Sequence, residues 1–262
     1  MTTLDTDGER LMADDRRARI LQDLHRDGRV LSKDLSRRYG VSEDAIRRDL
    51  RDLASLKLLQ RVHGGALPIS NALEPYAVRR AQQTAAKQDV ARTVAGWVRP
   101  NQVLLVDGGS TLAEVITHLP AGLNLTVITH NLHAALALTT RPDIRGVLLG
   151  GQIDPVSQIT SGVHTHEMIG TVRADVCLLG VCGLHPEHGL SAAYHEEAQL
   201  KRAMIRQSAE CAVVLTQDKL GTTAPYAVVP AAEIDTLFIE PQVTAELLEP
   251  YRALGIQVIR GA

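Results

Sequence analysis

The sequence predicts an α/β protein in two parts, a small N-terminal unit and a larger C-terminal unit built on a mainly parallel sheet. Its 262 residues are enough for two domains of ordinary size. Within residues 16–68, three short amphipathic helical segments precede a Gly-Gly hairpin signal. From residue 87 onward, apolar runs alternate with helical segments, a pattern typical of a parallel sheet covered on both faces.

Composition narrows the class of protein. No apolar run reaches the length of a membrane span, and residues 1–17 lack the apolar segment of a secretory signal. Cys177, Cys182 and Cys211 form no disulfide or metal-binding pattern. We therefore expect a cytoplasmic protein with reduced thiols and no membrane partner.

Charge is unevenly distributed along the chain. Residues 16–68 contain 13 Lys and Arg against seven Asp and Glu, whereas residues 69–262 contain 14 against 18. A basic unit joined to an acidic one indicates that the first unit binds an anionic partner.

Three helices are expected in the N-terminal unit, after residues 1–15, which we expect to be flexible. The first stops at Gly28. The second begins with Ser32 as its N-cap and ends at Gly40, and the third begins with Ser42 as its N-cap. Its buried stripe is formed by Ile46, Leu50 and Leu53.

This arrangement predicts a winged helix-turn-helix, in which the third helix enters the major groove of double-stranded DNA. An Arg-rich helix alone is more often a solvated face. The hairpin at Gly64 and Gly65 adds a wing, however, and three capped helices with a basic balance favour DNA binding. The residues expected at the DNA are Ser32, Lys33, Ser42, Glu43, Ala45, Arg47, Arg48, Arg51, Arg61, His63, Gly64 and Gly65.

The stretch VSEDAIRRDLRDL, followed by LLQRVHGGA, resembles the DeoR family of bacterial transcriptional regulators. The resemblance implies an operator DNA as partner. Ala45 stands where the family often has Thr, so a hydroxyl contact to a base is lost there, although the methyl group can still touch thymine.

A linker with a helix is expected at residues 69–86, followed by the larger unit at residues 87–262. Strands are expected within residues 102–109, 125–130, 145–151, 174–183, 211–218, 234–240 and 256–260. Helices are expected within residues 86–98, 111–119, 131–140, 165–172, 195–209 and 244–255. This alternation predicts a Rossmann-like unit.

Polar and glycine-rich clusters follow several of these strands, at the edge where such sheets bind ligands. The most informative is Asp107-Gly108-Gly109-Ser110-Thr111, because the glycines allow close backbone approach and the following helix start attracts an anion. It matches neither dinucleotide nor nucleoside triphosphate motifs. The alternative, a plain strand-to-helix turn, is not decided by the loop alone.

The resemblance to the DeoR family extends through the larger unit. The motifs that carry it are DGGST at residues 107–111, THNL at 129–132, the paired glycines at 150–151, AD at 174–175 leading to LG at 179–180, EA at 197–198 with KR at 201–202, and DK at 218–219. It implies a sensor and oligomerisation domain with a fold like ribose-5-phosphate isomerase, which answers to a phosphorylated sugar. The effector-binding residues so implied are Lys87, Asp107, Gly108, Gly109, Ser110, Thr111, Thr129, Asn131, Gly150, Gly151, Gly180, Gly183 and Lys219. The resemblance implies that residues 109–111 hold the phosphate, helped by Thr129, Asn131 and Lys87, whereas Lys219 and the loop at residues 180–183 face the sugar. His130 stands where the family commonly has Asn.

A regulator is favoured over an enzyme. An aldose–ketose isomerase needs a carboxylate base, and the isomerase relatives carry an acidic element where this chain has residues 179–182, without an acid. We expect Asp107 to orient its loop, and Glu196 and Glu197 to form solvated ion pairs. An isomerase-like enzyme fused to a DNA-binding unit is the alternative, and a body that only oligomerises is a third possibility.

No cofactor or metal is expected, because the His-rich middle of the chain lacks a metal-binding spacing. The resemblance implies a regulator, most often a repressor, of carbohydrate-metabolism genes. Since two operator half-sites require two DNA-binding units, we expect a homo-oligomer, a dimer or larger.

Overall fold

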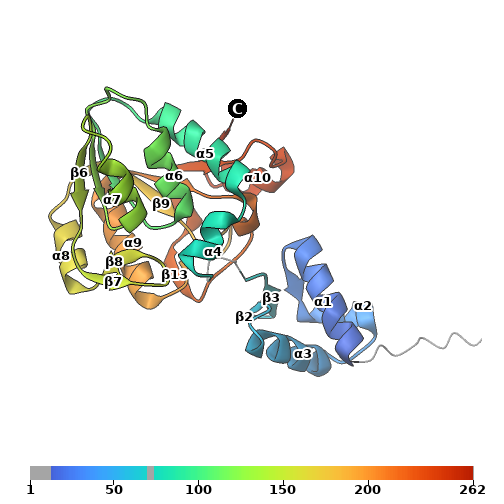
Figure 1. The fold of residues 1–262 in the computed structure, drawn as a ribbon. Helices are drawn as coiled ribbons and strands as arrows, with labels where there is room; N and C mark the ends of the chain where they lie inside the picture. Colours follow the sequence, from blue (N-terminus) through green and yellow to red (C-terminus); the bar gives the residue numbers. More distant parts are fainter. Residues whose placement is uncertain (1–12, 70–73, 262) are drawn as a thin grey trace, which may run out of the picture. The chain divides into compact units, whose positions relative to one another are not determined.

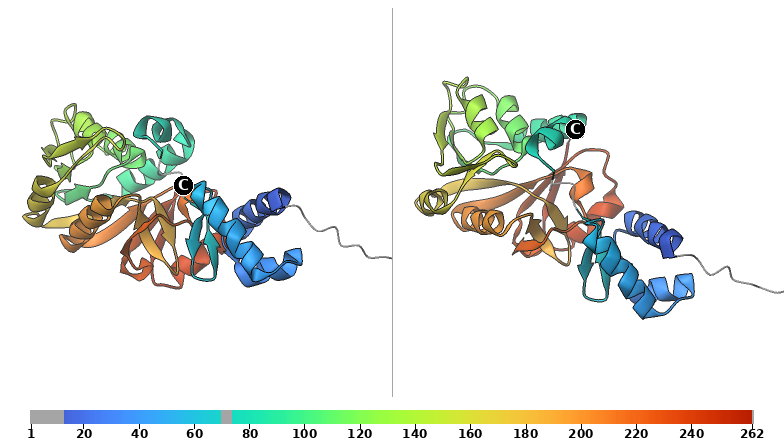
Figure 2. Two further views of the ribbon diagram at one scale, coloured as in Figure 1. Left: turned by 90° about the horizontal axis from the view of Figure 1, so that it is seen from below. Right: turned by 60° about the horizontal axis from the view of Figure 1, so that its bottom comes forward.

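The computed structural model describes residues 13–69 and 74–261, which fall into two compact units divided between Ile69 and Ser70 (Figures 1 and 2). The first helix begins at Ala13, so residues 13–15 of the segment expected to be flexible are helical. The remainder of that segment, residues 1–12, lies outside the described residues.

The N-terminal unit contains the three predicted helices and a small antiparallel sheet with strand order β1-β3-β2. Strands β2 and β3 form the predicted wing hairpin. The elements are α1 (Ala13–Asp27), β1 (Val30–Leu31), α2 (Ser32–Tyr39), α3 (Glu43–Ser55), β2 (Gln60–Val62) and β3 (Gly65–Leu67).

Two of the three predicted helix caps are confirmed. The hydroxyl of Ser42 accepts a hydrogen bond from the backbone N–H of Ala45 at 3.2 Å, which makes Ser42 the N-cap of α3. Gly40 ends α2 in the left-handed conformation, with φ 63°. The prediction for Ser32 is wrong, because Leu31 precedes α2 as its N-cap and Ser32 is the first helical residue.

A single core joins the three helices, and Ile20, Leu35, Ile46 and Leu50 are almost fully buried in it. A buried ion pair between Arg16 of α1 and Asp49 of α3, with a 2.6 Å Nε–Oδ2 distance, ties the first helix to the third. The orientation of α3 is therefore fixed by both apolar and charged contacts.

The C-terminal unit is an α/β fold around a seven-stranded parallel sheet with strand order β15-β14-β12-β9-β4-β5-β6. The sheet strands are β4 (Val103–Val106), β5 (Thr126–Thr129), β6 (Arg145–Leu148), β9 (Ala174–Gly180), β12 (Ser208–Val214), β14 (Thr236–Ile239) and β15 (Gln257–Arg260). The helices are α4 (Tyr76–Ala81), α5 (Thr84–Trp97), α6 (Ser110–His118), α7 (Leu132–Leu138), α8 (Val163–Gly170), α9 (His195–Arg206) and α10 (Ala245–Arg252).

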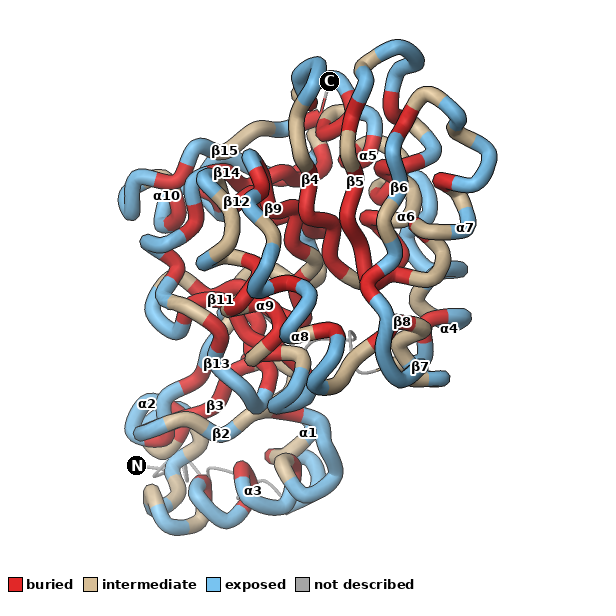
Figure 3. Tube along the Cα trace, turned by 90° about the vertical axis from the view of Figure 1, so that its left-hand side faces the viewer, coloured by how far each residue is buried: buried red, intermediate tan, exposed pale blue. Residues whose placement is uncertain are grey.

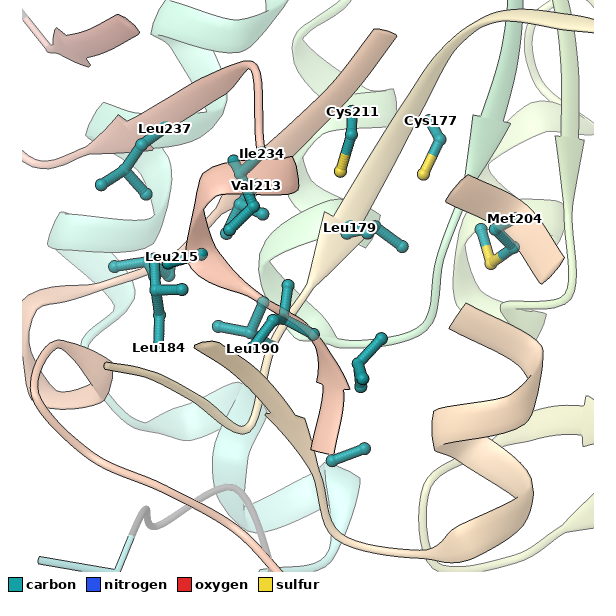
Figure 4. Close-up of a cluster of buried hydrophobic side chains, with 14 of the residues drawn as sticks. Cys177, Leu179, Leu184, Leu190, Met204, Cys211, Val213, Leu215, Ile234 and Leu237 are labelled. Atoms are coloured by element: carbon teal, nitrogen blue, oxygen red, sulfur yellow. The ribbon is translucent and has the colours of Figure 1, made fainter. Parts of the chain in front are cut away.

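Both faces of this sheet are covered, as the continuous apolar runs predict. Leu104 and Val106 of β4 pack in one cluster with residues of α5, α6 and α7, whereas the intervening Leu105 packs in another cluster with residues of α8, α9 and α10. In Figure 3 most residues of the strands β4, β5 and β9 are buried. The second cluster is almost entirely aliphatic and includes Cys177 and Cys211 side by side (Figure 4).

Shorter strands were not predicted. β7 (Gln152–Asp154) and β8 (Ile159–Ser161) form a hairpin after β6, and a second antiparallel sheet contains β10 (Gly183–His185), β11 (Gly189–Ala192) and β13 (Tyr226–Val229). The run expected as one strand at residues 174–183 ends its parallel pairing at Gly180. Within the described ranges, no helix has the length and apolar character needed to cross a membrane.

Candidate functional site

The exposed basic surface of the N-terminal unit lies on α3 and the wing. Arg47, Arg48, Arg51 and Arg61 are all exposed, as are Lys33, Ser42, His63 and Gly64 among the other predicted residues. Arg47 is paired with Glu43 at 3.2 Å and with Asp44 at 3.4 Å. Among the described residues, Arg48, Arg51 and Arg61 form no ion pair, so their guanidinium groups are available to an anionic partner.

Two of the predicted DNA-binding residues are buried and have structural contacts instead. Ser32 is 4% exposed, and its backbone N–H donates to the carbonyl of Gly64 at 2.8 Å. Gly65 lies against β1, where a Cβ atom would come within 2.0 Å of the carbonyl oxygen of Val30. Both residues therefore hold the wing in place, and their contact with DNA stays a prediction.

A pocket in the C-terminal unit opens at the carboxyl ends of β4 and β9. The chain proceeds from β4 to β5 and β6 on one side and places β9, β12, β14 and β15 on the other, which makes this the switch point of the sheet. We call it the switch-point pocket. Seven of the predicted effector-binding residues line it, namely Asp107, Gly108, Gly109, Ser110, Thr111, Gly180 and Lys219.

The loop after β4 forms the floor of the pocket. Gly109 precedes α6 with φ 109°, a conformation that side-chain-bearing residues rarely adopt. No side chain caps the start of α6, so the first backbone N–H groups of this nine-residue helix remain available to an anion. Ser110 and Thr111 are nearly buried and add two hydroxyl groups to the pocket lining.

Asp107 holds this loop from the interior of the protein. Its carboxylate, 1% exposed, accepts from Nε2 of His130 at 2.9 Å, from the backbone N–H of Gly180 at 3.0 Å, and from Nζ of Lys201. Burial opposes its charge, but Lys201 and His130 outweigh burial and lower the pKa of Asp107 to about 2. Asp107 therefore orients the loop, as expected, and it joins β4, β9 and α9.

Thr129 and Asn131 were expected to contact the phosphate, but they are fully buried beneath the loop. The hydroxyl of Thr129 donates to the carbonyl of Val106 at 2.7 Å. The amide of Asn131 donates to the carbonyl of Gly109 at 3.0 Å and accepts from the first N–H groups of α7. Their polar atoms are occupied in shaping the loop.

Lys87 lies beside the pocket rather than in it. Its Nζ donates to the carbonyls of Arg79 and Gln82 and so holds the end of α4, and burial together with Lys219 and Arg79 lowers the pKa of Lys87 to about 8. Lys87 lines a smaller side pocket that shares Arg79, Ser110 and Lys219 with the switch-point pocket. Burial also lowers the pKa of Lys219.

Lys219 lines both the switch-point pocket and the side pocket. Within the described ranges its ammonium group forms no hydrogen bond or ion pair, although Asp218 lines the side pocket nearby. Lys219 is half-buried, and a partly desolvated cation without a partner favours an anionic ligand at this position rather than the neutral part of a sugar that the resemblance implies.

Several residues of the pocket lining were not predicted, including Glu74, Tyr194 and Cys182. Glu197 also lies here, and its expected role as a solvated ion pair is wrong. It is half-buried, lies 3.2 Å from Nζ of Lys201, and accepts from the backbone N–H of Ala193 at 3.2 Å. The i, i+4 spacing of Glu197 and Lys201 indicated their pairing but not their burial. Glu196, by contrast, is exposed.

Three predicted glycines lie outside both pockets. Gly150 and Gly151 form an exposed bend, which Thr165 of α8 anchors by donating to the carbonyl of Gly150 at 2.6 Å. Gly183 packs against the backbone of Thr222. Among residues 13–69 and 74–261, no group of three His, Cys, Asp or Glu side chains is placed to hold a metal ion.

Comparison with known proteins gives matches to both units. Residues 16–72 match the family described as the DeoR-like helix-turn-helix domain, and residues 82–240 match the DeoR C terminal sensor domain. The glycerol-3-phosphate regulon repressor of Escherichia coli (strain K12) is 32% identical over 222 residues, which cover 84% of this chain and 88% of that protein.

Two further relatives are similar over most of their length. A putative aga operon transcriptional repressor of Escherichia coli O157:H7 is 28% identical over 99% of this chain and 98% of its own. The transcriptional repressor GlcR of Bacillus subtilis (strain 168) is 29% identical over 88% of each chain. Among solved structures, ribose 5 phosphate isomerase A from Neisseria gonorrhoeae is a distant match, with a TM-score of 0.37, 13% identity, and coverage of 52% of this chain and 53% of that one.

Proposed function

Because the chain belongs to the DeoR family of transcriptional regulators, we propose that it is a DNA-binding repressor of carbohydrate-metabolism genes whose operator binding is controlled by a phosphorylated sugar or sugar derivative. The names of its relatives support the repressor part, since they describe transcriptional repressors, one of them of a glycerol-3-phosphate regulon.

The N-terminal unit supports the choice of DNA as partner. Its α3 is a capped recognition helix with Arg48 and Arg51 exposed and unpaired among the described residues, and the wing presents Arg61 and His63. Arginines of this kind bind phosphates or guanine edges in the major groove.

One observation carries the effector part of the proposal, namely the unpaired Lys219 beside the uncapped start of α6 in a pocket at the switch point. Backbone N–H groups, the Ser110 and Thr111 hydroxyls and a cation together form a site suited to a phosphate. The carboxylate of Glu197 and the hydroxyl of Tyr194 also line the pocket and are suited to the hydroxyl groups of a sugar.

An isomerase activity has less support. Three carboxylates line the pocket, but Asp107 and Glu197 are both bound by Lys201, and Glu74 accepts from the amide of Gln82 at 2.6 Å. A general base takes a proton from the substrate, and the ion pairs with Lys201 disfavour protonation of Asp107 and Glu197.

Control of DNA binding requires two arrangements of the protein that differ in effector affinity. In a symmetric homo-oligomer, these arrangements would differ in the spacing of two DNA-binding units relative to two operator half-sites. The effector shifts the balance only by the difference between its affinities for the two arrangements.

The test is a band-shift titration on the promoter DNA beside the protein's own gene. Glycerol 3-phosphate and a panel of sugar phosphates are added, each with its dephosphorylated counterpart as control. At least one phosphorylated compound should change operator affinity, and the double variant Ser110→Ala/Thr111→Ala should lose this response while it retains DNA binding. If no compound changes the affinity of the wild type, the effector proposal is refuted. Turnover of a sugar phosphate by the purified protein would favour the enzyme instead.

A further inference from the structure

Helix α4 connects the pocket with the DNA-binding unit along the chain. It is the first helix that the structure describes in the C-terminal unit, and it begins seven residues after Ile69 ends the N-terminal one. It brings Arg79 to the lining of the switch-point pocket and of the side pocket, next to Ser110 and Lys219. Sequence reasoning did not identify Arg79, because it lies in a segment that was expected to be a linker.

The guanidinium of Arg79 lies close to the loop that starts α6. A Cβ atom placed on Gly109 would lie 4.0 Å from Nη1 of Arg79. The Nε of Arg79 donates to the carbonyl of Glu74 at 3.0 Å, and its guanidinium carbon lies 5.8 Å from the centre of the Tyr76 ring. In the described part of the chain, Arg79 forms no ion pair. Its terminal nitrogens therefore remain available to a ligand held by the Gly109 loop.

Two small groups of contacts hold α4 on the body. At its start, the backbone N–H of Tyr76 donates to the carbonyl of Val156 at 2.8 Å, and the Tyr76 ring stacks on His133 with 4.1 Å between ring centres. At its end, Nζ of Lys87 donates to two carbonyls of the last turn. Tyr76 is the one buried residue of this six-residue helix, so a ligand contact can change the position of α4 at low cost.

We propose that Arg79 is a ligand of the effector's phosphate, and that this contact fixes α4 against the loop at the start of α6. The inference rests on the proposed function, which supplies the phosphate. Arg79, Lys219 and the Ser110 hydroxyl would then surround the anion from three elements, α4, the loop after β12 and α6. The residues that join the two units come directly before α4 in the chain. Occupancy of the pocket is therefore transmitted through the backbone from α4 to the DNA-binding unit.

The test compares the full-length wild type with Arg79→Ala, Arg79→Lys and the matched control Arg80→Ala. Arg80 is the neighbouring arginine on the same helix, but it is exposed and lines neither pocket. Calorimetric titration with inorganic phosphate and with the sugar-phosphate panel measures affinity, and the band shift at saturating ligand measures control of the operator. Thermal melting checks that each variant is folded.

Arg79→Ala should weaken binding of the active compound about 10- to 100-fold, the range expected for loss of charge-assisted hydrogen bonds to a phosphate. Arg79→Lys keeps the charge but not the forked geometry and should lie between, whereas Arg80→Ala should stay within about twofold of the wild type. At saturating ligand, Arg79→Ala should still show a smaller change in operator affinity than the wild type.

Equal ligand affinity in Arg79→Ala and Arg80→Ala would overturn the assignment. A full operator response of Arg79→Ala at saturating ligand would overturn the role of α4 in transmission. If Arg79→Ala does not fold, unchanged affinity in Arg79→Lys would overturn the forked contact. If the wild type itself binds no phosphorylated compound, the proposed function fails, and this inference fails with it.

Discussion

Replacement of Lys201 by Met tests whether the buried network beneath the pocket holds the C-terminal unit together. The substitution keeps the length of the side chain but removes the cation from Asp107 and from the carbonyl of Gly180, which Nζ contacts at 2.8 Å. Asp107 would remain as a buried carboxylate with two of its three donors. Loss of one partner of a buried ion pair costs about 3–5 kcal/mol, and we expect a destabilisation of that size at pH 7.

The destabilisation caused by Lys201→Met should depend on pH, because it depends on the charge of Asp107. Burial disfavours the charge of Asp107, but Lys201 and His130 bring its pKa to about 2, below the ~3.9 of an unfolded chain. In the wild type, this depressed pKa contributes about 2–3 kcal/mol of stability above pH 5, which is lost as the pH falls toward 2. Without Lys201 the pKa of Asp107 rises, so protonation relieves the buried charge. The difference between variant and wild type should therefore shrink between pH 7 and pH 4.

The assay is urea unfolding followed by tryptophan fluorescence. The chain has a single tryptophan, Trp97 in α5, which packs edge-on against Phe238 in the C-terminal unit, so the signal reports that unit. Arg206→Met, an exposed position on the same helix, is the control and should change the free energy of unfolding by no more than ~0.5 kcal/mol. A loss below about 1 kcal/mol for Lys201→Met, or one that is equal at pH 7 and pH 4, would refute this reasoning.

Three further predictions concern other parts of the chain. Arg48→Ala should weaken operator binding and reduce the slope of its salt dependence by about one. Arg47→Ala should have a smaller effect, because Arg47 is already paired with two carboxylates. Band shifts at several salt concentrations measure both variants. Gly65→Ala should destabilise the N-terminal unit by several kcal/mol, because its Cβ would meet the Val30 carbonyl; circular dichroism melting checks this, and an unchanged melting temperature would contradict it. Cys182 is buried, and burial raises its pKa to about 12, so iodoacetamide at pH 8 should modify it far more slowly in the native than in the unfolded protein, as measured by mass spectrometry.

The sequence was sufficient to predict elements whose pattern is long and regular. The apolar runs around β4, β5, β9 and β12 identified the parallel sheet, and the residues after β4 identified the edge of the sheet where the switch-point pocket lies. Ser42 was recognisable as a cap because its side chain acts on the backbone three residues away. Each of these features depends on residues that are close together in the sequence, so the sequence pattern alone predicts it.

The parts that sequence reasoning missed depend on contacts across long stretches of chain. Lys201 reaches Asp107 from 94 residues away, which no spacing rule reveals. Thr129 and Asn131 have the chemistry of phosphate ligands. In the fold, however, their side chains donate to the backbone carbonyls of Val106 and Gly109. The strands β10, β11 and β13 are three or four residues long, too short to show a period.

The lining of the pocket combines anchored and exposed residues, and this affects how the protein could be redesigned. The loop after β4 is anchored in the core through Asp107 and the strand termini, whereas Tyr194 in the same lining is exposed. Libraries restricted to Tyr194 should therefore yield biosensors for new metabolites without loss of folding.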